Sequence, residues 1–170
     1  MSEAPGVTSS GAVAGGPALA ITRAGAFAGL LDLTAAITQG LLRGRPPERV
    51  LQSIATGWLG KASYNGGWGS AILGFVTHFF IAMVWAALFW AVSRRARTLV
   101  RHAWQWGALY GLFVYAVMYE VVMPLSAIHR RIPRTPQDYL TGMLIHVFCV
   151  GLPIALTVRA HFPRSVVTRS

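Results

Sequence analysis

Charged side chains are scarce in this chain. Asp, Glu, Lys and Arg make up 12% of its 170 residues, and five residues are acidic. A soluble domain usually carries about a quarter charged residues, so the deficit argues against a water-soluble globular protein. The mean hydropathy of +0.51 and the apolar content of 54% indicate a membrane protein instead.

The chain also has a single cysteine and lacks the features of a secretory signal. The single cysteine, Cys149, excludes an intrachain disulfide and is expected to pack as a small apolar residue. The chain does not begin with the basic segment of a secretory signal. Residues 1–17 are small, Gly-rich and polar, which predicts a disordered tail. The first apolar run after this tail is therefore expected to be a retained span.

Long apolar runs dominate the rest of the sequence. Clusters of Lys and Arg separate four of them, at residues 24–42, 71–92, 103–125 and 140–158. Each run is near the ~20 residues that a helix needs to cross a ~30 Å hydrocarbon core. Because lipid offers no hydrogen-bond partner to backbone N–H and C=O groups, each crossing must be helical. We predict an all-α integral membrane bundle of four transmembrane helices over residues 18–160, followed by a basic C-terminal tail at 161–170.

Two loops contain signals for the start of a helix. In the first loop, RPPERV at residues 45–50 places prolines where a helix can begin, and apolar residues then recur at helical spacing. This predicts an amphipathic helix that lies flat in the membrane interface or packs on the bundle as a short connecting helix. In the third loop, residues 135–138 (TPQD) have the pattern of a capping box at the start of the fourth helix.

The positive charge lies at the ends of the apolar runs. A net charge of +10 would suggest nucleic-acid binding in a soluble protein. At span ends, however, arginines anchor a helix at the interface and attract anionic head groups. We predict membrane lipids, anionic ones included, as partners and no nucleic acid. An interfacial aromatic belt is expected from Trp85, Phe89, Trp90, Trp104 and Trp106.

This positive charge is divided almost evenly between the two sides of the membrane. The N-tail, second loop and C-tail carry Arg23, Arg94, Arg95, Arg97, Arg101, Arg159, Arg164 and Arg169. The first and third loops carry Arg43, Arg45, Arg49, Lys61, Arg130, Arg131 and Arg134. The short second loop is dense in arginine, which favours an orientation with both termini in the cytoplasm.

Each apolar run contains one ionisable residue well inside it: Asp32, His78, Glu120 and His146. Counted from the side of the first and third loops, they lie roughly 15, 11, 8 and 9 Å deep at 1.5 Å per residue. All four therefore occupy one half of the membrane. Asp32 shares a helix stripe with small residues, which allow close helix approach. We expect it to face the bundle interior, with the two histidines as its available partners.

We predict that this polar layer supports helix packing or assembly, with a second copy or another membrane protein as partner, because buried polar residues often act as interhelical glue. The first alternative is proton- or small-solute-linked transport, since intramembrane acids and histidines mark such routes. The second alternative is a haem or metal site. Two histidines and two carboxylates suit a transition metal, and His78 and His146 suit the axial positions of a haem.

Signatures of enzyme and cofactor sites are missing. The Glu-x-x-His ligand pair of di-iron bundles is absent, as are the Cys-x-x-Cys-His haem motif and a serine nucleophile elbow. We therefore expect no catalytic residue and predict no cofactor. The alternative is a haem or a transition metal at His78 and His146.

The chain contains the segments GLLDLTAAI, PERVLQSIATGWLGKASYNGGW, ILGFVTHFFIA and PLSAIHRR. Together these four segments resemble an uncharacterised group of small four-span bacterial inner-membrane proteins. The likeness extends from about residue 22 to residue 158. It implies a location in the inner membrane and brings no activity, cofactor or site residue with it.

Overall fold

The computed structural model describes residues 16–128 and 135–167. The disordered tail predicted at 1–17 lies outside the described residues as far as residue 15, and the first helix begins at Pro17. The interfacial arginines predicted at 130, 131, 134 and 169 also lie outside the described residues. Within them every regular element is helical. Four helices are long and apolar enough to cross a membrane: Pro17–Leu42, Gly67–Arg95, Ala103–Leu125 and Pro136–Ala160. The predicted all-α architecture with four spans is confirmed.

Two of the spans are α-helical throughout, and two contain a π-helical segment. The first and second are α1 (Pro17–Leu42) and α3 (Gly67–Arg95). The third comprises α5 (Ala103–Val117), the π-helical η2 (Met118–Val122) and α6 (Met123–Leu125), and the fourth comprises α7 (Pro136–Ile145), the π-helical η3 (His146–Gly151) and α8 (Leu152–Ala160). The shorter elements are α2 (Pro47–Leu59), the 3₁₀ helix η1 (Gly60–Asn65), α4 (Thr98–Arg101) and α9 (Arg164–Val167).

Proline accounts for the two π-helical segments. Pro124 follows η2 and Pro153 follows η3, each two residues after the segment ends. A proline offers no N–H to the carbonyl four residues earlier, and its ring clashes with that carbonyl. The residues four positions earlier are Glu120 and Cys149, which lie inside η2 and η3. The wider π turns therefore accommodate a proline without breaking the span.

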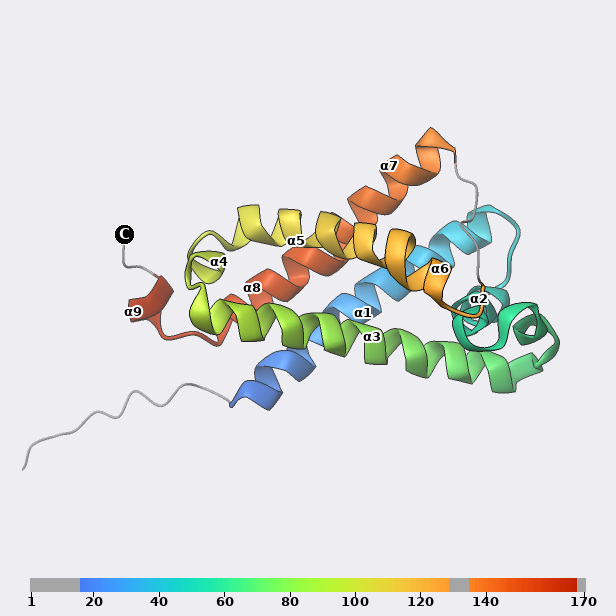
Figure 1. Ribbon diagram of the computed structural model, residues 1–170, viewed down its shortest axis with the longest axis horizontal. Coiled ribbons are helices and arrows are strands. Elements are labelled where there is room, and N and C mark those ends of the chain that lie inside the picture. Colours follow the sequence, from blue (N-terminus) through green and yellow to red (C-terminus); the bar gives the residue numbers. More distant parts are fainter. Residues whose placement is uncertain (1–15, 129–134, 168–170) are drawn as a thin grey trace, which may run out of the picture.

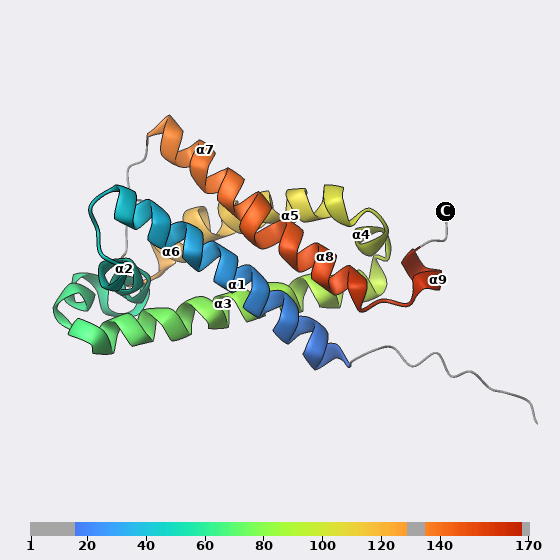
Figure 2. The same ribbon diagram turned by 180° about the vertical axis from the view of Figure 1, so that it is seen from behind.

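The spans form two crossed layers (Figures 1 and 2). In Figure 2, α1 and the fourth span run side by side in front, with α3 and the third span behind them. The α4 segment joins α3 to α5 at one end of the bundle, and α2 lies across the opposite end, seen end-on in Figure 1. Because α2 also packs on α3 and α1, the predicted amphipathic helix is both transverse to the spans and docked on them.

Glycines hold the third and fourth spans in close contact. A Cβ atom at Gly107 would lie 2.9 Å from the Cβ of Ala155, and one at Gly111 would lie 2.7 Å from the Cα of Val147. A Cβ at Gly151 would lie 2.6 Å from the Cα of Gly111. Small residues spaced four apart therefore let the two backbones touch, as in many membrane helix pairs.

The hydrophobic core is concentrated toward the α4 end of the bundle. Phe89 is 1% exposed, and its ring centroid lies 4.9 Å from that of Tyr110 on α5. The Tyr110 hydroxyl donates a hydrogen bond of 2.6 Å to the Trp85 carbonyl, which joins α5 to α3. The prediction that Phe89 belongs to an interfacial aromatic belt is therefore wrong, because its ring packs against Tyr110 in the core. Trp104 and Trp106 are exposed, as a belt requires.

The glycine contacts predict opposite effects of the same substitution at two positions. Gly111→Ala should lower the free energy of unfolding by about 1–3 kcal/mol, because the new methyl group meets backbone atoms of the fourth span. Gly69→Ala, with nothing within 4 Å of the new Cβ, should raise it by about 0.5–1 kcal/mol through the higher helix propensity of alanine. Equilibrium unfolding in mixed micelles measures both, and equal effects would contradict the close contact.

Candidate functional site

A cavity of about 940 Å³ occupies the half of the bundle that faces α2. Its walls come from α1, α2, η1, α3, α5, η2, α6, α7 and η3. The Tyr110 bond joins α3 to the third span at the α4 end, and toward α2 the cavity lies between these two spans. A volume of this size is in the range of ~300–1,000 Å³ that is typical of small-molecule sites.

Three of the four predicted layer residues line this cavity. Asp32, His78 and His146 contribute to its wall from the first, second and fourth spans. Asp32 is accompanied by four residues from its own helix stripe, namely Ala28, Gly29, Ala36 and Gln39. The structure therefore places the Asp32 stripe toward the interior, as the small residues predicted.

Glu120 lies apart from this group. It is in η2, its side chain is exposed, and it is not among the cavity-lining residues. Gly107 and Gly111 turn the opposite face of the third span toward the fourth. The close packing of these glycines thus directs Glu120 outward, although its depth matches that of the other three residues.

The two histidines bond to backbone carbonyls. His78 Nε2 donates to the Gly29 carbonyl at 2.8 Å, which bridges α3 to α1. His146 Nδ1 donates to the Gly142 carbonyl at 2.9 Å within its own span, and its ring packs against those of Tyr115 and Tyr119 at centroid distances of 5.2 and 5.8 Å. The expected direct pairing of Asp32 with a histidine is therefore not formed.

The Asp32 carboxylate makes no hydrogen bond or ion pair with any other residue that the structure describes. Its side chain is partly exposed, and that exposure is to the cavity it lines. An ionised carboxylate at this depth is costly unless water or a cation solvates it. The cavity is the space from which such a group can reach Asp32.

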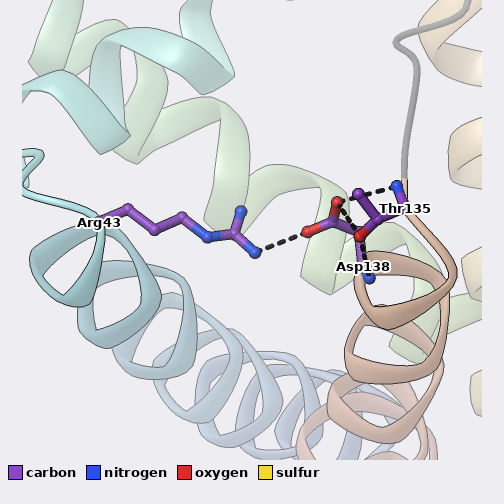
Figure 3. Close-up of polar contacts among 3 residues, drawn as sticks. All are labelled: Arg43, Thr135 and Asp138. Carbon is purple, nitrogen blue, oxygen red and sulfur yellow. Dashed lines mark hydrogen bonds and ion pairs between the residues drawn. The ribbon is translucent and has the colours of Figure 1, made fainter.

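An ion pair joins two of the cavity-lining residues, Arg43 and Asp138 (Figure 3). An Arg43 guanidinium nitrogen donates to Asp138 Oδ1 at 2.6 Å, which joins the end of α1 to the start of α7. The other carboxylate oxygen accepts from the Thr135 backbone N–H at 3.0 Å and from its hydroxyl at 2.8 Å. The Asp138 N–H in turn donates to the Thr135 hydroxyl, which completes the predicted capping box. Both charged partners line the cavity.

Sequence reasoning missed this ion pair and most of the polar rim. Successive spans alternate in direction, so the end of the first span and the start of the fourth must lie on one side of the membrane. That signal places Arg43 and Asp138 on the same side, although 95 residues separate them. Further polar cavity-lining residues are Arg45, Ser53, Thr56, Tyr64, Thr77, Tyr119 and Ser126.

The described residues contain no group of three or more His, Cys, Asp or Glu side chains that is arranged to hold a metal ion. His78 Nε2 and His146 Nδ1, the weak candidates for metal or haem ligation, are both directed at carbonyl oxygens. The geometry therefore adds no support for a metal or haem site at these two residues.

Comparisons with protein-family models, with curated proteins and with solved structures found no match. The resemblance to small four-span bacterial inner-membrane proteins therefore stays a prediction.

Water in the cavity can be tested with introduced cysteines in a Cys149→Ala background. Ala36 lines the cavity, whereas Thr34 is exposed on the outer surface of the same helix and does not line it. In lipid vesicles, Ala36→Cys should react with a charged methanethiosulfonate at least about tenfold faster than Thr34→Cys, because a thiol in lipid forms little thiolate. Equal rates would contradict an aqueous cavity next to Asp32.

Proposed function

We propose that the chain is a multi-pass protein of the bacterial inner membrane that binds a small solute in its cavity as part of solute- or proton-linked transport. The observation that supports this function is the Asp32 carboxylate, which lines the cavity without a hydrogen bond or ion pair to another described residue. A residue that served as interhelical glue would bond across the helix interface. Asp32 is instead available to a group inside the cavity.

The surroundings of Asp32 support the same function. Toward α2 the cavity wall includes hydroxyl, amide and guanidinium groups, among them Gln39, Arg43 and Tyr64. These groups lead from the loop side of the bundle toward the carboxylate. A polar solute or a proton carried by water could follow them to Asp32 without crossing lipid, which is the usual role of an intramembrane acid in a transporter.

Helix packing and assembly form the second candidate function, and His78 favours it. Its bond to the Gly29 carbonyl is a direct contact between α3 and α1. Such bonds contribute about 0.6 kcal/mol on average in membrane proteins, with a maximum near 1.7 kcal/mol. His78 thus has the geometry of a packing residue, while Asp32 has that of a binding residue.

The proposed function predicts solute effects that depend on Asp32. A panel of small cations, anions and neutral solutes is screened against purified protein, and at least one should raise the Tm of wild type but not of Asp32→Asn. The same solute should accelerate dissipation of a pH gradient in wild-type proteoliposomes loaded with pyranine. The reason is that the amide removes the charge that the solute or proton engages.

Glu120→Gln is the matched control, since it removes a carboxylate from the same membrane half outside the cavity. It should respond like wild type. If no solute distinguishes wild type from Asp32→Asn while His78→Ala destabilises the fold, the packing function replaces the binding function.

Orientation gives an independent prediction. The end of α3 carries Arg94 and Arg95, and the segment from there to α5 carries Arg97 and Arg101. Arginines so close to two span ends stay in the cytoplasm. A C-terminal green fluorescent protein fusion should fluoresce in the inner-membrane fraction, and a C-terminal alkaline phosphatase fusion should be inactive. The reverse pair of results would place both termini outside the cytoplasm.

A further inference from the structure

The cavity differs in charge between its rim and its inner part. Among the described residues that line the cavity, Asp32 and Asp138 are acidic and Arg43 and Arg45 are basic. Arg43 is neutralised by Asp138 at the rim, and it lies eleven residues from Asp32, roughly 16 Å along the helix axis. Among the described Asp, Glu, Lys and Arg side chains, Asp32 is therefore the one that lines the inner part of the cavity.

The two histidines near Asp32 each direct one ring N–H at a backbone carbonyl. An anion bound here would be placed beside a carboxylate with little water to screen the repulsion. A cation would instead supply the partner that Asp32 lacks among the described residues.

The remaining wall is suited to an apolar body. Phe80, Val121 and Leu125 line the cavity between α3 and the η2–α6 segment, and they are 63%, 47% and 78% exposed. This wall is thus continuous with the outer, lipid-facing surface. Trp85 and Tyr119 also line the cavity, and aromatic rings attract cations through their electron-rich faces.

We propose that the ligand of this cavity is an organic cation with an apolar body, whose positive charge pairs with Asp32 and whose body packs against the wall between α3 and the third span. This inference rests on the proposed solute-binding function and names its ligand class. The negative charge of Asp32 favours a positively charged ligand, and the apolar wall favours a ligand with a large apolar part.

Two hydrophobic ions of the same shape and opposite charge test the proposal. Tetraphenylphosphonium and tetraphenylborate are titrated against purified full-length protein in neutral detergent, with protein-free micelles as the blank. Wild type should bind the phosphonium at least about tenfold more tightly than the borate, the change that corresponds to ~1.4 kcal/mol. Asp32→Asn should lose this preference, and Glu120→Gln should keep it.

The site of binding has its own readout. Saturating tetraphenylphosphonium should slow modification of Ala36→Cys, which lines the cavity one turn from Asp32, and should leave the reactivity of a cysteine at the exposed Gly69 unchanged. Protection at both positions would indicate general adsorption to the micelle and would overturn the assignment to the cavity.

The relative affinity of the wild-type protein for the two ions tests the cationic class even if Asp32→Asn does not fold. Asp32→Glu retains the charge and should retain the preference for the phosphonium. Equal binding of the two ions, or tighter binding of the borate, would overturn the cationic class. In that case an anionic or neutral solute that still required Asp32 for its Tm effect would leave the proposed binding function standing.

Discussion

The hydrocarbon core of a membrane offers no hydrogen-bond partner, and this constraint governs every polar group inside the bundle. The helical backbone satisfies itself, and the π turns before Pro124 and Pro153 keep each span continuous. The histidines meet the constraint with backbone carbonyls. Asp32 has no such partner among the described residues. A cavity beside it is therefore a physical requirement, because a carboxylate facing packed apolar side chains would be far more costly.

The cavity arises from uneven packing along the bundle. Toward α4, glycine contacts and the Tyr110–Trp85 bond bring the spans together around buried Phe89. Toward α2, the cavity lies between α3 and the η2–α6 segment, and residues of both line it. The transverse α2 covers this end and bonds to it, since the Gly57 carbonyl accepts from the Ala127 N–H at 2.9 Å. The spans are thus tightly packed at the α4 end of the bundle and enclose the cavity toward the α2 end.

Span positions and the inward face of Asp32 were predictable, because apolar length and a stripe of small residues are local properties of the sequence. The capping box at Thr135 was predictable for the same reason. The outward direction of Glu120 and the burial of Phe89 depend on partners from other spans, namely the fourth span against Gly107 and Gly111, and Tyr110. Depth in the membrane is set by counting residues, whereas orientation around the helix axis is set by packing.

The polar layer therefore separates into residues with different physical roles. Loss of the His78 bond to Gly29 would remove a contact between two spans, which is a contribution to stability. Loss of the Asp32 carboxylate would remove no hydrogen bond or ion pair within the described protein, and would relieve the cost of holding a charge at this depth. A group that the fold would be more stable without is typical of a functional site. Stability alone gives a reason to keep His78 and none to keep Asp32, and the proposed cationic ligand would supply that reason.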